Sequence, residues 1–317
     1  VVAMDKRRIV AFRDECGIRP LSIAKIDGGY AVASETCAFD TIGAEFVRDV
    51  EPGELVVISD EGLTSHQVRS GNLKLDIFEM VYFARPDSQL LGKRVDGIRK
   101  NFGREMAKEF PIKADVIIPV PDSGIPAALG YSQASGIPFE MGLIKNRYIH
   151  RTFIRPTTQL RERDLKMKLN PVIETIKDQR VVLVDDSIVR GTTMRHLVSM
   201  VFEAGAKEVH LLITSPPVRY PDFYGINTPR QSELLAAYMT EDEMRDYVGA
   251  TSLCFLSYDG MLNATELPKD SFSTSHFDGV YPISIGKRAD EIAQLKAGQT
   301  LPKGGHQPTK LATARTA

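Results

Sequence analysis

The feature that most constrains how this chain can fold is an apolar strand that runs directly into two acids and a glycine-threonine turn. The string RVVLVDDSIVRGTT occupies 180–193, and apolar residues then recur at helical spacing through 192–204. A further apolar run, EVHLLI, follows at 208–213. Strand, helix and strand in this order predict a βαβ unit and therefore a mostly parallel sheet.

The rest of the chain divides into two regions with different sequence patterns. From about residue 95 helical and apolar strand patterns alternate, which predicts an α/β domain with a helix at 95–109, a strand at 115–120, a helix at 124–134 and a strand at 139–144. The first 66 residues instead contain short β segments separated by turn signals, at 9–12, 21–26, 30–34 and 54–59. The predicted class is α/β, with helices on both faces of the sheet and a β-rich segment before it.

Composition excludes several broad classes of function. The 317 residues include 40 Lys plus Arg and 41 Asp plus Glu, so no global field attracts nucleic acid or an anionic membrane. No uninterrupted apolar run approaches the ~20 residues that a membrane span needs. Three widely separated cysteines indicate a reducing compartment rather than a disulfide framework. We therefore expect a cytoplasmic protein with neither a nucleic-acid nor a membrane partner.

The glycine-threonine turn has the chemistry of a phosphate site. Gly191 would let the main chain come close to a ligand, and the free amides at the following helix start attract an anion. Hydroxyl groups that could add further donors belong to Ser187, Thr192 and Thr193.

The two acids before the turn have a complementary use. At the carboxyl end of a strand, Asp185 and Asp186 could hold sugar hydroxyls or a Mg²⁺ ion, which prefers oxygen ligands. An ordinary acidic turn before a capped helix is the alternative, but the complete string favours a phosphorylated sugar. Neither an ATP P-loop nor a Rossmann glycine fingerprint is present in the sequence.

In the form DDSIVRGTT, this string resembles the phosphoribosyl pyrophosphate (PRPP) motif of type I phosphoribosyltransferases, and specifically that of the glutamine PRPP amidotransferases. The resemblance extends from about 10 to about 260 and includes further stretches: IRPLSI (18–23), ASETCAFD (33–40), VEPGE (50–54), IFEMVYFARPDS (77–88), KNRY (145–148), RTFIRP (151–156) and SPPVRYPDFYGIN (215–227). Members of this family make 5-phosphoribosylamine from PRPP and glutamine, the first step of purine biosynthesis. The implied fold is a type I phosphoribosyltransferase domain preceded by the β-rich end of an N-terminal-nucleophile hydrolase domain.

The resemblance implies roles for individual residues. Asp185 and Asp186 would act in catalysis, facing the ribose hydroxyls and Mg²⁺, and Ser123 in the expected pyrophosphate loop at 119–131 would lie near the same ion. The residues implied to wrap the 5'-phosphate are Ser187, Ile188, Val189, Arg190, Gly191, Thr192 and Thr193.

A basic stretch at 145–168 carries eight Lys or Arg against two acids. A nucleic-acid site would need more aromatic residues between these charges. The resemblance implies a mobile loop over PRPP, with Lys145 and Arg147 binding phosphates and Arg151 assisting catalysis. His150 stands where close relatives commonly have Gly, so the closing geometry of this loop is an open question.

The chain departs from the family pattern in two respects. It begins at Val1, whereas the family has an amino-terminal catalytic cysteine, so we expect no glutaminase activity and transfer only from free ammonia unless a separate amino-terminal piece completes the fold. Some relatives hold an iron-sulfur cluster through four cysteines. Cys37 matches the first of them, but Asp222 replaces a second and no Cys-x-x-Cys follows, so no cluster is expected.

The expected organisation is a glutaminase remnant at 1–66, a phosphoribosyltransferase domain at 67–267 and an extension at 268–317 that is flexible at its end. The expected ligands are PRPP and ammonia or glutamine, with AMP and GMP as possible inhibitors, in a homo-oligomer. Two alternatives remain open: a nucleobase-salvage phosphoribosyltransferase, and a PRPP or nucleotide sensor without catalysis.

Overall fold

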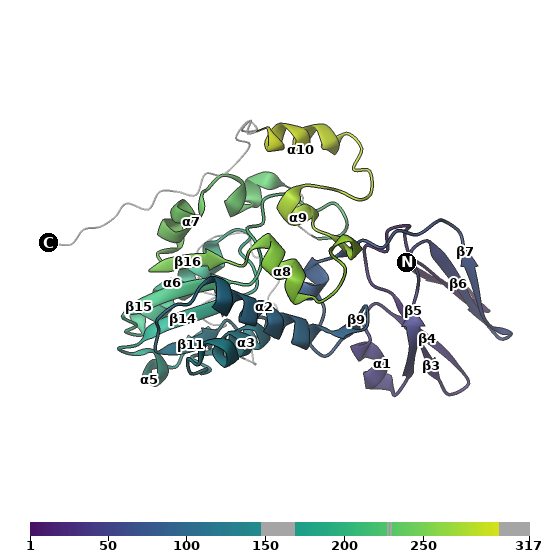
Figure 1. Cartoon of the computed structure of the whole chain (residues 1–317). Coiled ribbons are helices and arrows are strands. Elements are labelled where there is room, and N and C mark those ends of the chain that lie inside the picture. The colour runs from purple at the N-terminus through teal and green to yellow at the C-terminus, as the bar shows by residue number, and fades with distance from the viewer. Residues whose placement is uncertain (147–168, 227, 229, 298–317) are drawn as a thin grey trace.

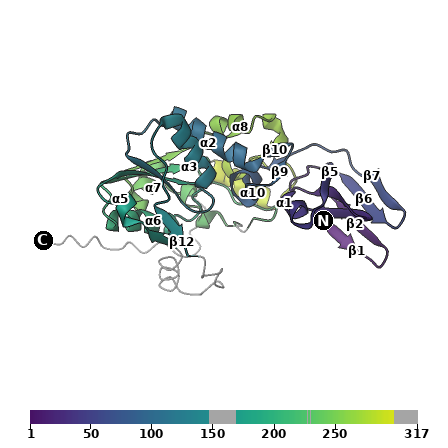
Figure 2. The same cartoon turned by 90° about the horizontal axis from the view of Figure 1, so that it is seen from below.

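The computed structural model describes residues 1–146, 169–226, 228 and 230–297 (Figure 1). A β-rich amino-terminal part lies to one side of an α/β domain in both views (Figures 1 and 2). Within the described ranges no helix is long and apolar enough to cross a membrane.

The amino-terminal part contains two antiparallel sheets, one ordered β1-β2-β6-β7 and the other β4-β3-β5. Its elements are β1 (Val2–Met4), β2 (Arg8–Phe12), β3 (Ser22–Ile26), β4 (Gly29–Ala33), α1 (Cys37–Ile42), β5 (Glu45–Asp49), β6 (Glu54–Ser59) and β7 (Gly62–Gln67). Alternate residues of β6 are buried, and Ala11, Ile23 and Val56 from three strands meet in one small core. The two sheets therefore share their inner faces.

A parallel sheet ordered β11-β14-β15-β16 forms the centre of the α/β domain. Its strands and main helices are β11 (Val116–Pro119), β14 (Arg180–Asp185), β15 (Glu208–Ile213), β16 (Ser252–Phe255), α2 (Val95–Glu109), α3 (Ile125–Ser135), α6 (Thr192–Glu203), α7 (Glu241–Val248) and α8 (Tyr258–Ala264). Val182 and Val184 face the core built with α2, α3 and α8, whereas Val181 and Leu183 face the core built with α6 and α7. Burial on both faces explains the continuous apolar run in β14.

Shorter elements connect and cover this sheet. They are β8 (Leu75–Asp76), a π-helical turn (Glu79–Phe83), β9 (Gln89–Leu90), β10 (Lys93–Arg94), β12 (Leu143–Lys145), β13 (Leu169–Pro171), α5 (Ile173–Ile176), 3-10 turns (Gln231–Glu233, Leu235–Ala237 and Lys269–Ser271), β17 (Phe272–Ser273), α9 (Ser275–Asp278) and α10 (Arg288–Lys296).

The α/β predictions are confirmed with small shifts. Helix α2 has the predicted bounds, and α6 ends one residue before the predicted 204. The strand predicted at 139–144 is wrong in extent, because β12 begins at Leu143 and Phe139 makes only an isolated bridge to Ile117. In the amino-terminal part, the sequence patterns do not predict β1, β5, β7 or α1. Strand β7 has a largely polar, exposed sequence, so its pairing with β6 leaves no apolar alternation to detect.

The boundary expected at residue 267 does not separate a loose extension from the domain. Strand β17 pairs in parallel with β8, and Phe277 in α9 joins the core cluster that contains Phe78. Residues 272–278 are therefore part of the α/β packing, because their apolar side chains are buried there. The flexible tail expected at 301–317 lies outside the described residues.

Helices α2 and α3 pack closely through two glycines. A Cβ atom at Gly103 would lie 1.9 Å from the carbonyl oxygen of Ala127, and one at Gly130 would lie 1.9 Å from that of Lys100. Main-chain atoms cannot move aside as a flexible side chain can. The absence of a side chain at both positions thus sets the separation of the helices that cover one face of the sheet.

Replacing Gly103 with alanine should therefore lower the free energy of unfolding by about 2 kcal/mol or more, through overpacking. Gly97 lies in the same helix, and its Cβ would meet nothing within 4 Å. Gly97→Ala should instead stabilise the protein by up to about 1 kcal/mol through helix propensity. Urea unfolding of both variants measures the difference, and equal effects would contradict the packing argument.

Candidate functional site

The candidate site lies where two neighbouring parallel strands end. Strand β11 leads into a turn before α3, and β14 leads into the acid pair and the turn before α6. The Val120 amide donates to the Val184 carbonyl at 2.8 Å, and a Cβ atom at Gly124 would lie only 2.4 Å from that carbonyl oxygen. This close approach brings the expected pyrophosphate loop beside the acids, as expected where the carboxyl ends of parallel strands meet.

Four side chains converge at this point. The hydroxyl of Ser123 lies 3.4 Å from Oδ1 of Asp185, and that same oxygen accepts the Asp186 amide at 2.9 Å. The Ser187 hydroxyl donates to Oδ1 of Asp186 at 2.5 Å. The structure therefore places Ser123, predicted from a separate stretch of sequence, beside the acid pair, although 62 positions separate it from Asp185.

Both acids are largely withdrawn from solvent, with exposed fractions of 9% for Asp185 and 7% for Asp186. Burial raises the pKa of Asp185 well above its ordinary value, and the neighbouring charge of Asp186 raises it further. Burial also raises the pKa of Asp186, against hydrogen bonds from the two serines and the positive charge of Arg99, which lower it. A cation bound here would relieve this repulsion, and the carboxylate and hydroxyl oxygens fit the hard ligands that Mg²⁺ prefers.

The turn from Ser187 to Thr193 has several of its side chains packed into the protein, so it presents mainly main-chain groups at the edge of the sheet. Gly191 precedes α6 with φ of 73°, a left-handed conformation, and the hydroxyl-bearing Thr192 and Thr193 are exposed in the first helical turn. Ile188 packs into the core with α6, and the Val189 carbonyl accepts the Leu235 amide at 2.8 Å. The side chains of Ile188 and Val189 pack into the two cores, so these positions offer main-chain groups rather than side chains to the turn.

Basic groups near the site are already paired. Nε of Arg190 lies 3.0 Å from Oε2 of Glu233. Lys145, at the end of β12, reaches Asp122 in the β11–α3 turn with Nζ 2.6 Å from Oδ2, and both of these side chains are exposed. Lys145 therefore lies at the expected pyrophosphate loop. Arg147, His150 and Arg151 lie outside the described residues.

Sequence reasoning missed Arg99 and Asp122. Arg99 is buried in α2 and donates to the carbonyls of Met80 and Ala84, at 2.8 Å each. Its position in the apolar stripe with Ile98 and Phe102 could have indicated a special role, because a charged residue is rarely fully buried without partners. Nothing local in the sequence distinguishes Asp122 from an ordinary turn residue.

The parallel sheet, with an acid pair and a glycine-threonine turn at its carboxyl edge, lies within residues that match a known family. The family described as phosphoribosyl transferase domain matches residues 88–215. More particularly, the chain is similar to amidophosphoribosyltransferases over about nine-tenths of its length. It is 49% identical to the amidophosphoribosyltransferase of Mycobacterium bovis over 287 residues and 50% identical to that of Synechocystis over 281 residues, or 89% and 87% of this chain.

A solved structure is similar to this chain in both sequence and fold. Glutamine PRPP amidotransferase from B. subtilis, complexed with ADP and GMP, superposes with a TM-score of 0.84 at 46% identity. The alignment covers 90% of this chain and 64% of that one. The chain spans 54% of the Mycobacterium relative and 57% of the Synechocystis relative. The predicted fold class is confirmed: a phosphoribosyltransferase sheet preceded by antiparallel sheets.

Replacing Asp185 with asparagine should stabilise the metal-free protein, and more so at about pH 7.5 than at about pH 4. An aspartate with a raised folded-state pKa holds a proton that the unfolded chain releases near pH 4. The protonated Asp185 side chain therefore adds to the free energy of unfolding at low pH, and this stabilisation is lost as the pH rises through the folded-state pKa. Asparagine keeps the Oδ1 acceptor without the charge.

Urea unfolding in excess chelator at the two pH values measures this effect. Asp60→Asn, at an exposed position between β6 and β7, is the matched control and should change stability by less than about 0.5 kcal/mol. A loss of stability in Asp185→Asn, equal at both pH values, would contradict the electrostatic argument.

Proposed function

We propose that this chain carries the PRPP-dependent half of an amidophosphoribosyltransferase and forms 5-phosphoribosylamine and pyrophosphate from PRPP and ammonia. The observation that carries the proposal is the convergence of Ser123, Asp185 and Asp186 beside the turn at Gly191. Close identity to amidophosphoribosyltransferases over most of the chain favours this activity over nucleobase salvage.

Mg²⁺ is the proposed metal ion, held by Asp185, Asp186 and the Ser123 hydroxyl together with oxygens of PRPP. Bound there, the ion would supply positive charge to PRPP and its leaving pyrophosphate. The raised pKa values of the two buried aspartates support a cation at this position, since each carboxylate lacks a close basic partner among its described hydrogen bonds.

The protein's own groups would act by positioning. Main-chain amides from 187 to 193, with the hydroxyls of Thr192 and Thr193, hold the 5'-phosphate at the start of α6. Lys145, with Arg147 and Arg151, neutralises the pyrophosphate as its bond to the anomeric carbon breaks and ammonia forms the new carbon–nitrogen bond. No side-chain nucleophile is required, so positioning and exclusion of water carry the catalysis.

The remaining proposals concern the whole protein. Residues 1–66 are proposed as the end of a glutaminase domain, with glutamine-derived ammonia the nitrogen source when that domain is complete. The B. subtilis structure complexed with ADP and GMP supports testing AMP and GMP as inhibitors of this chain. We also propose a homo-oligomer in the cytoplasm.

Pyrophosphate release from PRPP and Mg²⁺ tests this function, with ammonia, glutamine and a purine base supplied separately. Ammonia alone should support release, because the proposed reaction needs no other nitrogen source. Asp186→Asn should lower kcat/KM with ammonia by about a hundredfold or more, because it removes charge next to the reacting centre.

The control variant is Asp60→Asn, which should keep full activity because Asp60 is exposed on the amino-terminal sheets. Release only with a purine base would overturn the proposal in favour of salvage. Tight PRPP binding without turnover under any condition would indicate a sensor.

Gly191→Ala should weaken Mg²⁺–PRPP binding by about tenfold or more. Its Cβ would lie 2.6 Å from Cδ2 of Leu235, and a left-handed conformation costs a non-glycine residue about 1 kcal/mol. Gly249 has a similar φ of 77°, but a Cβ there meets nothing within 4 Å. Calorimetry should therefore show unchanged PRPP binding in Gly249→Ala, and a similar loss in both variants would contradict a specific role for the turn.

A further inference from the structure

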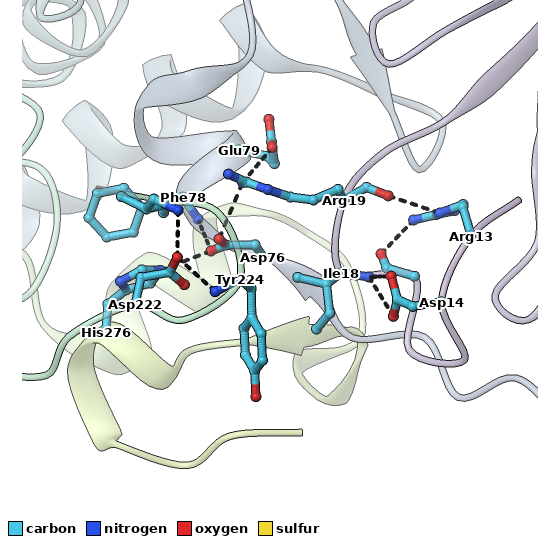
Figure 3. A network of polar contacts seen from close by, with 12 residues as sticks. Arg13, Asp14, Ile18, Arg19, Asp76, Phe78, Glu79, Asp222, Tyr224 and His276 are labelled. Carbon is cyan, nitrogen blue, oxygen red and sulfur yellow. Dashed lines mark hydrogen bonds and ion pairs between the residues drawn. The ribbon is translucent and has the colours of Figure 1, made fainter. Parts of the chain in front are cut away.

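A second cluster of potential metal ligands lies among residues that the proposed transferase reaction does not use. Asp76 ends β8, Asp222 lies in the loop after β15, and His276 belongs to α9 (Figure 3). Three segments far apart in the chain thus bring two carboxylates and one imidazole together. Their exposed fractions are 2%, 2% and 1%, so bulk solvent does not reach these three polar side chains.

The ligand atoms have the spacing of a single metal centre. Nε2 of His276 lies 3.3 Å from Oδ1 of Asp76 and 3.9 Å from Oδ1 of Asp222, and all three atoms lie within 4.8 Å of one another. Ligands bound at about 2.0–2.2 Å to one ion lie roughly 3–4 Å apart. One cation between these atoms would therefore need only small side-chain adjustments.

Two of these atoms have no hydrogen-bond partner within the described part of the chain. They are Oδ1 of Asp222 and Nε2 of His276, both fully buried and both facing the centre of the cluster. Buried polar atoms are almost always satisfied, and an exception calls for an unplaced ion or water. A metal ion would bind both atoms at once.

The surroundings hold the ligands in place for such an ion. The other oxygen of Asp222, Oδ2, accepts the amides of Tyr224 at 2.9 Å and Ile226 at 2.5 Å, which leaves Oδ1 directed into the cluster. The imidazole of His276 lies against Phe78 with ring centroids 4.4 Å apart. Hydrogen bonds and packing of this kind orient metal ligands in proteins.

The local charge also favours a cation. Arg19 lies 3.4 Å from Asp76 and 2.7 Å from Glu79, so one guanidinium faces these two carboxylates while Asp222 adds a third. A divalent ion would balance the excess negative charge.

We infer that Asp76, Asp222 and His276 bind one divalent transition-metal ion of the zinc type. Imidazole together with carboxylate oxygen suits Zn²⁺ or Co²⁺, whereas Mg²⁺ prefers oxygen alone. The ion would join β8, the loop after β15 and α9, and so hold the carboxyl-terminal segment at 272–278 against the α/β domain. This inference does not rest on the proposed transferase function.

Cobalt titration of the full chain, first stripped of metal by chelation, tests the site. Wild-type protein should bind about one equivalent of Co²⁺ with visible absorption bands of a nitrogen- and oxygen-ligated ion, and Zn²⁺ should displace it. Asp222→Asn and His276→Gln should each weaken binding by about tenfold or more. Zinc should also raise the melting temperature of wild-type protein and leave that of Asp222→Asn unchanged.

Matched controls exclude other sources of binding. His66→Gln and Asp60→Asn alter exposed residues on the amino-terminal sheets and should bind Co²⁺ as the wild type does. Asp185→Asn should also keep the site, which separates it from the proposed PRPP-linked Mg²⁺ centre.

Three outcomes would overturn the inference: no stoichiometric binding, equal binding in Asp222→Asn and His276→Gln, or sulfur ligation. The first would mean that His276 simply donates a hydrogen bond to Asp76. If the variants fail to fold, zinc-edge X-ray absorption of the wild-type chain still decides the question. One imidazole with oxygen ligands supports the site, and any other ligand set refutes it.

Discussion

The main-chain contact between the ends of β11 and β14 is the constraint on which the α/β site depends. The Val120 amide meets the Val184 carbonyl at 2.8 Å, and the turn that follows passes so close that only glycine fits at 124. Because the two strands are parallel and adjacent, both of their following turns open at the same edge of the sheet. The meeting of Ser123 with Asp185 follows from strand pairing, and the chemistry proposed for the site follows from that meeting.

Buried acidic side chains gather at two places in this molecule. At the acid pair, burial and the neighbouring charge of Asp186 raise the pKa of Asp185. The positive charge of Arg99 partly opposes the rise in the pKa of Asp186. At the junction near β8, one guanidinium, that of Arg19, faces both Asp76 and Glu79. Buried like charges cost stability in a free protein. Groups with pKa values shifted in this way are common at functional sites. The two clusters differ in chemistry, since the first offers only oxygen and the second adds an imidazole.

The packing also shows how the carboxyl-terminal segment belongs to the α/β domain. Strand β17 pairs in parallel with β8, and α9 brings His276 and Phe277 against Phe78. Residue order along the chain suggests an extension after 267, but the core is closed by residues on both sides of that point. The amino-terminal sheets keep a separate small core around Ile23 and Val56.

Local patterns in the sequence determined the helix at 95–109, the βαβ unit and the identity of the acid-glycine-threonine turn, because periodicity and turn chemistry act between near neighbours. Tertiary structure alone decided that Ile188 turns into the core, that Lys145 reaches Asp122, and that Arg99 lies buried near Asp186. It alone brought together Asp76, Asp222 and His276, which no local pattern relates. The reason is physical: contacts between residues distant in sequence depend on how strands pair and helices pack, and the type of a single residue does not indicate which residues it will contact.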